Sequence, residues 1–162
     1  SPAEVFELAA QVVKKAFPNA DLPRAVRSTG VEPLLTLASE ASLVTDLTRH
    51  VDRLLDEVPG TVGVIVPPTR LPGLRAALTA RLGSLVNPVD AERVIFVTPL
   101  EAKGLEYDAV VVVSPDEIVA QSPGGVRVLY VALTRPTQRL VTIDVGPAPG
   151  AWRESLSSPA TD

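Results

Sequence analysis

The 162-residue sequence contains no cysteine and only one histidine, His50. The absence of cysteine excludes a disulfide framework and a thiolate metal site, and a single histidine excludes a multi-histidine zinc site. With three Phe, two Tyr and one Trp, the chain has too few aromatic side chains for a surface that stacks along nucleic-acid bases. We therefore expect no resident metal, and no serine or threonine nucleophile assisted by histidine.

Long hydrophobic runs and excess positive charge are also missing. No apolar run approaches the roughly 18 residues that cross a bilayer, and the first residues carry acids where a signal peptide needs basic residues. We expect no membrane partner and a cytoplasmic location. The net charge of −4 argues against binding nucleic acid by bulk charge. Most of the basic residues are arginines, which suit bidentate contacts with phosphate or carboxylate groups.

Apolar periodicity alternates between helical and strand-like patterns along the chain. This alternation predicts an α/β fold, with helices flanking a mainly parallel sheet in a three-layer sandwich. Residues 1–145 form the expected domain, and the small and proline-rich residues 146–162 are typical of a tail or linker. Helices are predicted at 2–17, 42–58, 71–82 and 125–138, and strands at 34–38, 61–66, 93–98, 109–114 and 140–145, with a possible short strand at 25–27.

Ligands of parallel sheets bind at the carboxyl ends of strands, which draws attention to the loops after Val66, Val97, Val113 and Val145. The loop after Val97 contains Lys103, Gly104 and Glu106, a flexible turn with a cation and a carboxylate. These residues suit contacts with a phosphate or a ribose hydroxyl. They are also what an ordinary surface loop contains, and both interpretations stay open at this point.

The predicted helix 125–138 is mostly apolar, yet it presents Arg135 directly before Pro136 and Arg139 three residues later. A proline has no N–H and biases the preceding residue away from helical geometry. Arg135 is therefore placed where a fixed guanidinium group can meet a phosphate. Alternatively, Arg135 and Arg139 offset the negative carboxyl end of the helix.

Three segments together resemble conserved motifs of superfamily 1 helicases of the UvrD/Rep/PcrA type. AKGLEYDAVVV is similar to motif V, LYVALTRPTQRL is similar to motif VI, and SPAEV is similar to the end of motif IV. The resemblance extends over about residues 1–145, and the order and spacing of the motifs agree. It implies the second, C-terminal RecA-like domain of an ATP-driven motor that acts on DNA.

The resemblance also implies roles for individual residues. Arg135 matches the motif VI arginine finger and would be the catalytic residue; Glu106, Gly104 and Lys103 would lie at the nucleotide, and Thr98 with Lys103 at the nucleic acid. The sequence has no Walker A loop of the form GxxxxGK(S/T). ATP and its Mg²⁺ would therefore be held mainly by an N-terminal RecA-like domain outside this sequence. The arginine of motif IV would precede Ser1.

The segment VVVVSPDEI mimics a Walker B motif, but Pro115 interrupts it. We interpret it as a strand followed by a loop. Two further residues are set aside: we expect His50 to have a surface or capping role, and Trp152 to be a docking anchor or simply exposed.

Two positions depart from the motif patterns. Leu100 replaces the histidine of motif V, and Pro136 replaces the usual alanine of motif VI. With the segment RAVRSTG, these departures favour the HelD branch of the family, whose members use ATP and act on RNA polymerase. The partner is thus DNA or RNA polymerase. A further alternative, different in class, is an α/β binding module without catalytic activity.

Overall fold

The computed structural model describes residues 1–22, 28–85 and 88–156. Within these residues, parallel strands form one sheet in the order β1-β5-β4-β2-β3. The central strands β4 and β5 pair with one another, while β1 and β3 lie at the two edges. The strands are β1 (Leu34–Ala38), β2 (Val62–Ile65), β3 (Val94–Val97), β4 (Tyr107–Val113) and β5 (Pro136–Val145).

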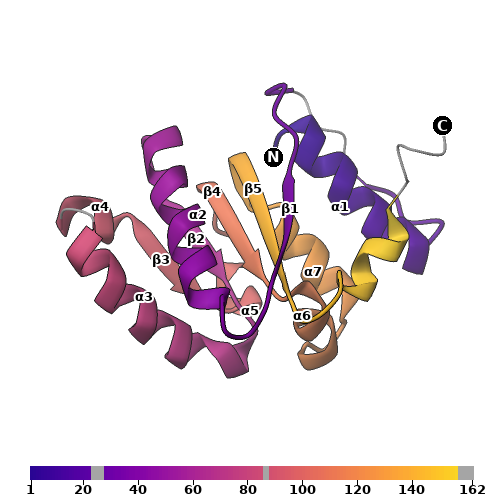
Figure 1. Ribbon diagram of the computed structural model, residues 1–162. Helices are drawn as coiled ribbons and strands as arrows, with labels where there is room; N and C mark the ends of the chain where they lie inside the picture. Colours follow the sequence, from indigo (N-terminus) through magenta and orange to yellow (C-terminus); the bar gives the residue numbers. More distant parts are fainter. Residues whose placement is uncertain (23–27, 86–87, 157–162) are drawn as a thin grey trace.

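Helices cover both faces of this sheet, as Figure 1 shows. One face packs against α2 (Leu43–Glu57) and α3 (Leu71–Leu85), and the other against α1 (Ala3–Ala16), α6 (Pro115–Gln121) and α7 (Val126–Leu133). The predicted three-layer α/β sandwich with a parallel sheet is confirmed. Shorter helical turns connect these elements: η1 (Pro68–Arg70), α4 (Pro88–Glu92), α5 (Pro99–Ala102) and η2 (Ala151–Ser155).

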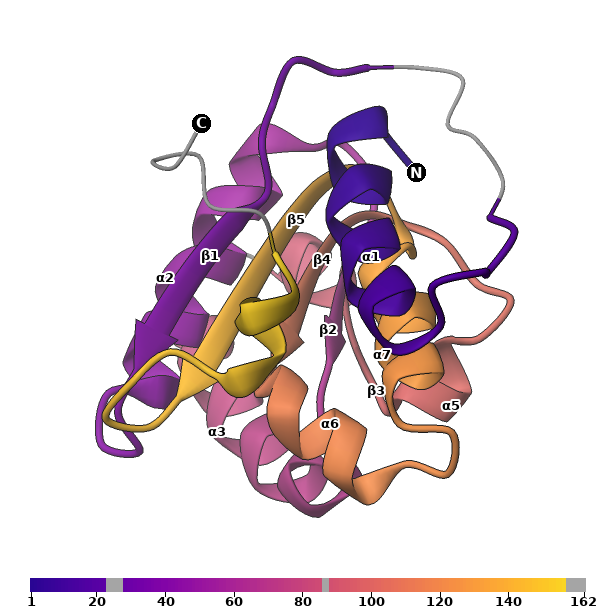
Figure 2. The ribbon, with the colours of Figure 1, turned by 90° about the vertical axis from the view of Figure 1, so that its right-hand side faces the viewer.

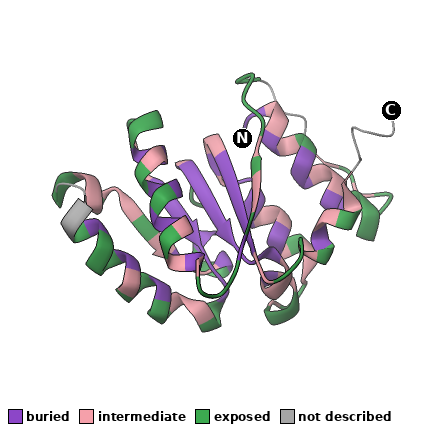
Figure 3. Ribbon diagram, in the orientation of Figure 1, coloured by how far each residue is buried: buried purple, intermediate pink, exposed green. Residues whose placement is uncertain are grey.

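The core consists of two apolar clusters, one on each side of the sheet. In β4, Val111 and Val113 belong to the cluster beneath α2 and α3, whereas Val110 and Val112 belong to the cluster beneath α1 and α7. All four side chains are fully buried, and Figure 3 shows the buried strands enclosed by half-buried and exposed helices. A strand covered on both faces reads as a continuous apolar run because neither face contacts water.

The predicted helix over 125–138 is wrong in its second half. Helix α7 ends at Leu133, and Pro136 is already the first residue of β5. Pro136 cannot donate a backbone hydrogen bond, and it is tolerated because it begins the strand. Arg139 therefore lies in a strand, where its Nε is 3.6 Å from Glu57 Oε2 of α2. It does not offset the carboxyl end of α7.

Other boundaries also differ from the expectation. The loop expected after β4 is helix α6, with Pro115 in its first turn, a position where the missing N–H costs nothing. Helix α3 continues through Gly83 instead of ending before it. The segment after Val97, interpreted as a loop, contains the short helix α5, and the short helix α4 is not among the predicted elements. The possible strand at 25–27 lies outside the described residues.

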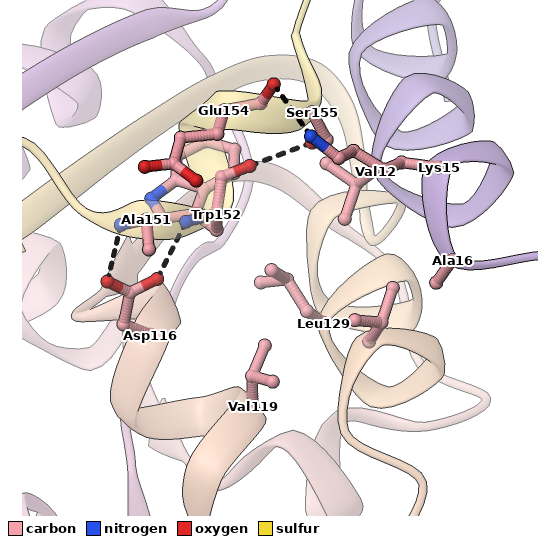
Figure 4. A pocket seen from close by; sticks show the side chains of 11 residues that line it. Val12, Lys15, Ala16, Asp116, Val119, Leu129, Ala151, Trp152, Glu154 and Ser155 are labelled. Carbon is pink, nitrogen blue, oxygen red and sulfur yellow. Dashed lines mark hydrogen bonds between the residues drawn. The ribbon is translucent and has the colours of Figure 1, made fainter.

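The first part of the segment expected to be a tail or linker packs against the domain. Trp152 is buried, and its Nε1 donates to Asp144 Oδ1 at 2.7 Å. Asp116 of α6 accepts hydrogen bonds from the backbone N–H groups of Ala151 and Trp152 at 2.7 and 2.9 Å. Figure 4 shows the two bonds of Asp116 beside a small cavity of about 270 Å³ between η2, α1, α6 and α7. Two carboxylates thus fix η2 to the sandwich.

The expected surface or capping role of His50 is wrong. His50 lies on the inner face of α2, is only 4% exposed, and its Nδ1 has no hydrogen-bond partner in the described part of the chain. Burial, assisted by Arg53 and Arg49, lowers the pKa of His50 below its ordinary value. His50 falls on the buried, mostly apolar face of α2, where an uncharged imidazole ring can pack.

Among the described residues, no helix is long and apolar enough to cross a membrane.

We predict that Gly63→Ala destabilises the fold. A Cβ atom at Gly63 would lie 2.8 Å from the Cγ and Cδ2 atoms of the buried Tyr107 ring, so strand and ring must move apart. Overpacking of this kind costs about 1–3 kcal/mol of unfolding free energy, measured by urea titration of Trp152 fluorescence. Gly73→Ala, in open space on α3, is the control, and it should stabilise the helix by about 0.5–1 kcal/mol. Equal effects of the two substitutions would refute the close contact.

We also predict that His50 makes the unfolding free energy decrease as the pH falls. Because its pKa is lower in the folded state than in the unfolded state, the unfolded chain takes up the proton first. The unfolding free energy should therefore decrease as the pH falls below about 6.5, the ordinary histidine pKa. In His50→Gln the decrease between pH 7.5 and 5.5 should be smaller. Identical pH profiles of the two proteins would contradict the assignment.

Candidate functional site

Thr98 stands directly after β3 and begins the one-turn helix α5. Its Oγ1 accepts the N–H of Glu101 at 3.3 Å, and Glu101 Oε1 accepts the N–H of Thr98 at 2.9 Å. This reciprocal pair is a capping box, which fixes both side chains. The bonds to Thr98 lower the pKa of Glu101. Thr98 is therefore rigidly held at the carboxyl end of β3 and half-exposed.

Lys103 to Glu106 form an exposed turn between α5 and β4. Gly104 has a φ of +83°, which residues with a Cβ rarely adopt, and the N–H of Leu105 closes the turn on Ala102 O at 3.1 Å. Lys103 and Glu106 thus flank a tight turn that exposes both side chains. No carboxylate of the described residues forms a salt bridge with Lys103.

Arg135 joins α7 to β5. Its Nε donates to Val131 O at 2.9 Å, its Nη1 to Leu105 O at 3.3 Å and its Nη2 to Thr134 Oγ1 at 3.2 Å. The side chain is half-buried. These partners are neutral, and within the described residues no acid lies within salt-bridge distance of it. The guanidinium caps the carboxyl end of α7, as one interpretation of the sequence expects, while its positive charge stays unpaired.

Arg135 and Glu106 lie at the same end of the sheet. It is the end at which the parallel strands begin, called the amino edge here, and the opposite end is called the carboxyl edge. The N–H of Tyr107 donates to Arg135 O at 3.2 Å, and Tyr107 pairs with Pro136, so Glu106 and Arg135 precede the paired starts of β4 and β5. The expectation that this chemistry gathers at the carboxyl ends of strands is wrong for these two residues. Their loops lead into strands, because α7 and the motif V segment both run back toward the amino edge.

Thr98 is separated from this pair by the length of the sheet. Val97 is level with Val112 through their common partner Ile65. Val112 lies six residue steps after Glu106, which is about 20 Å at about 3.3 Å per step. The predicted site residues are thus divided between two edges, with the turn at Lys103 and Gly104 between them.

The N-terminus of α1 lies beside the amino ends of β4 and β5, as Figures 1 and 2 both show. The residues that resemble the end of motif IV therefore share an edge with Arg135. Glu4 of this segment accepts hydrogen bonds from the N–H groups of Thr29 and Gly30 at 3.1 and 2.8 Å, and from the Ser28 hydroxyl. These bonds, led by that of Ser28, lower the pKa of Glu4 to about 2.

Sequence reasoning missed the main-chain carbonyl of Leu105 and the hydroxyl of Thr134, which hold Arg135. It also missed Tyr107 and Tyr130. Burial raises the pKa of both tyrosines above its ordinary value, and the positive charge of Arg135 opposes part of this rise. A backbone acceptor leaves no signal in the sequence, because any residue supplies one.

The acids of the Walker B mimic are engaged in structural bonds. Asp116 holds η2, and Glu117 accepts hydrogen bonds from Arg70 Nε at 3.0 Å and Ser114 Oγ at 3.0 Å. In the described part of the chain, no group of histidine, cysteine or acidic side chains is arranged to hold a metal ion. The segment is a strand followed by helix α6 instead of the predicted loop, and both acids have structural partners.

Comparison with known proteins bears on the same residues. Residues 94–143, which extend from β3 through most of β5, match the family model described as UvrD-like helicase C-terminal domain. The match confirms the predicted resemblance. No curated protein sequence matches the chain.

Among solved structures, the chain is similar to the C-terminal domain of a possible DNA helicase from Lactobacillus plantarum WCFS1. The TM-score is 0.71 and the sequence identity 21%, and the likeness covers 97% of this chain and 92% of that one. This likeness shows that the fold extends over nearly the whole chain, beyond the segment matched by the UvrD-like family model.

We predict that the capping box stabilises the start of α5. Thr98→Ala removes the acceptor for the N–H of Glu101 and should lower the unfolding free energy by about 1 kcal/mol in urea titrations. Thr98→Ser keeps the oxygen acceptor and is the matched control. If the alanine and serine variants unfold at the same urea concentration, the capping bond contributes nothing.

Proposed function

We propose that this chain is the C-terminal motor domain of an ATP-dependent, UvrD-like DNA helicase or translocase. The UvrD-like match over residues 94–143 supports the class of protein. The observation that carries the proposal further is the state of Arg135, a half-buried guanidinium held by two carbonyl groups and a hydroxyl without any acid partner in the described residues.

The surroundings of Arg135 fit a partner with negative charge. A guanidinium that is already oriented and is not neutralised stabilises the charge that spreads over a phosphoryl group during transfer. In this proposal, ATP supplies that phosphoryl group when it is bound by an N-terminal RecA-like domain, which also holds the Mg²⁺. Arg135 is the arginine finger, and the exposed Glu106 with the turn at Lys103 and Gly104 contacts the nucleotide.

The other edge of the sheet supplies the contact with the polymer. Thr98 is fixed by its capping box and Lys103 carries an unpaired charge, so together they suit a phosphate of the nucleic-acid backbone. The segment Thr98–Glu106, which leads into the resemblance to motif V, connects the two edges. Closure of the two motor domains on ATP would move this segment and the polymer bound to it.

One observation favours a second candidate function, a HelD-like ATPase that acts on RNA polymerase. Leu100, at the position where motif V of the UvrD type has histidine, is 79% exposed. An exposed leucine suits a protein surface. Salt titration distinguishes the candidates, because DNA binding weakens steeply with salt through counterion release, whereas a protein complex need not follow that slope.

We predict that Arg135→Ala lowers kcat for ATP hydrolysis by about 10³ in the protein that carries both motor domains. KM for ATP should change little, because the finger acts mainly on the transition state. Arg139→Ala is the control, since Arg139 faces Glu57 of α2, which covers the face of the sheet opposite to α7. Near-ultraviolet circular dichroism of Trp152 checks that Arg135→Ala is folded. Unchanged ATP turnover in the folded variant would exclude Arg135 as the finger.

A further inference from the structure

Strand β1 is an edge strand, because it pairs with β5 on one side and with no other strand of the described residues. Figure 2 shows it beside β5, on the side of the sheet away from β3. Its sequence LLTLA contains no charged residue and no proline, and its pairing with residues 141–145 of β5 runs without a bulge. Charges, prolines and bulges are the features by which natural proteins protect an edge strand. The outer side of β1 has none of them.

Alternate residues of β1 direct their backbone groups toward β5 and away from it. Ala38 O accepts the N–H of Gly146, which continues β5, at 2.9 Å, so the backbone of Ala38 faces β5. Because this alternation has a period of two residues, the backbone of Thr36 faces β5 as well. Leu35 and Leu37 therefore present their N–H and C=O groups on the outer side, where each supplies one donor and one acceptor.

Arg153 of η2 contacts β1 without covering this outer side. Its Nη2 donates to Thr36 O at 2.8 Å, and its Nε lies 2.6 Å from Asp144 Oδ2 of β5. Because Thr36 O lies on the side of β5, Arg153 ties β1 to β5. It does not occupy the outer backbone groups of Leu35 and Leu37.

The other edge strand, β3, is protected. Val97 O accepts the N–H of Val66, which continues β2, at 3.0 Å, so the backbone of Val97 faces the sheet. The carbonyl of the preceding Phe96 therefore faces outward. Arg75 of α3 donates from Nη2 to that carbonyl at 3.3 Å, which places a charged side chain on the outer side of β3. The open side of β1 is thus not a general property of this sheet.

Exposed apolar side chains lie on both faces of β1. Leu34 and Leu37 are 41% and 42% exposed. Leu34 shares a face with Ala38, which belongs to the cluster beneath α2 and α3, and Leu37 lies on the other face with Leu35. A strand laid along β1 would cover part of both exposed leucines, since cross-strand neighbours contact each other on each face of a sheet.

Acidic residues flank β1 at both ends. Glu32 precedes the strand and Glu40 follows it, and both are exposed. Glu40 shares the guanidinium group of Arg70 with Glu117, at distances of 2.5 and 2.6 Å, so two carboxylates face one cation at this end. The flanks of β1 therefore favour a partner with basic residues at its own ends.

A second copy of this chain does not suit the outer side of β1. When two β1 strands pair antiparallel along their whole length, Leu34 of one copy lies opposite Ala38 of the other. Glu32 then lies opposite Glu40, and like charges directly opposite each other destabilise a strand pair. A strand from a different protein, with basic ends, avoids this repulsion.

We propose that β1 docks an extended segment of another protein, which adds a strand to the sheet through the outer backbone groups of Leu35 and Leu37. Apolar residues of the segment contact Leu34 and Leu37, and basic residues at its ends face the two flanking acids. A helix does not suit this surface, because its backbone groups are already bonded within the helix. The surface does not depend on the proposed ATPase chemistry, so the proposal goes beyond the proposed function.

The test uses the 162-residue chain and end-capped, fluorescein-labelled peptides, whose binding is followed by fluorescence anisotropy. The probe is the peptide KKVTVTVKK. EEVTVTVEE reverses the charges at its ends, and KKVTPTVKK removes a central N–H. The probe should bind with a Kd below about 1 mM. Each control peptide should bind at least about fivefold more weakly, because the first loses cross-strand charge pairs and the second loses a backbone hydrogen bond.

Substitutions in the chain test the same contacts. Leu37→Pro removes an outward N–H and should weaken binding of the probe at least about tenfold, while the pairing of β1 with β5 loses no bond. Leu37→Thr keeps the N–H and should weaken binding about threefold through the lost apolar contact. Ile95→Thr on β3 is the matched control and should leave binding unchanged. Glu32→Lys should shift the preference from the basic peptide toward the acidic one.

Urea titration of Trp152 fluorescence checks that each variant is folded, and Leu37→Thr serves if proline disturbs the strand. Amide hydrogen exchange, measured by NMR, locates the bound probe. In the free chain the N–H groups of Leu35 and Leu37 should exchange faster than those of Thr36 and Ala38. Saturation with the probe should protect Leu35 and Leu37.

Four outcomes overturn the proposal. They are no binding of the probe up to about 1 mM, binding that ignores both the peptide charges and the substitutions at Leu37, and protection confined to other elements. The fourth is dimerisation of the chain, measured by light scattering, that Leu37→Pro abolishes, because the occupant is then a second copy. The assays contain no ATP, so their failure is separate from a failure of the Arg135 experiment.

Discussion

The hydrogen bonds of Arg135 join the two segments on which the proposed function depends. One side chain caps the carboxyl end of α7 through Val131 O and reaches Leu105 O in the turn of motif V. Because both partners are backbone carbonyls, the guanidinium is oriented without being neutralised. A salt bridge would have fixed it equally well and removed the charge that a phosphoryl group requires. The side chain of Arg135 therefore holds the turn at Leu105 next to the carboxyl end of α7.

Acidic and basic side chains of the domain differ in whether they have partners. Carboxylates near the carboxyl ends of β4 and β5 form hydrogen bonds or ion pairs within the domain. Asp144 and Asp116 bind η2, and Glu117 binds Arg70. Cations along motif V and α7 have no such partners in the described residues. An acidic protein can in this way present local positive sites, because binding responds to nearby charges and not to the net charge.

The segment Thr98–Glu106 links the two edges of the sheet. Thr98 stands at the carboxyl edge, Glu106 at the amino edge, and Gly104 allows the tight turn between them through its positive φ. The departures from the family pattern lie along this segment and its neighbour. Leu100 exposes an apolar side chain on α5, and Pro136 begins β5, so that Arg135 stands at the junction between α7 and β5. The chemistry of both positions differs from histidine and alanine, and next to Pro136 the pairing of β4 with β5 shifts its register between Tyr107 and Ala109.

The sequence by itself determined the α/β class, the parallel sheet and the identity of most helices and strands. Continuous β-branched runs such as that of β4 and the apolar period of α1 depend on local residue order. It also singled out Thr98, Lys103, Gly104, Glu106 and Arg135. Tertiary structure alone decided that α7 stops at Leu133, that His50 is buried, and that Trp152 docks on Asp144. It also decided that Arg135 and Glu106 share the amino edge while Thr98 lies at the other. These outcomes depend on contacts between residues distant in the chain, and local patterns carry no information about partners that only folding brings together.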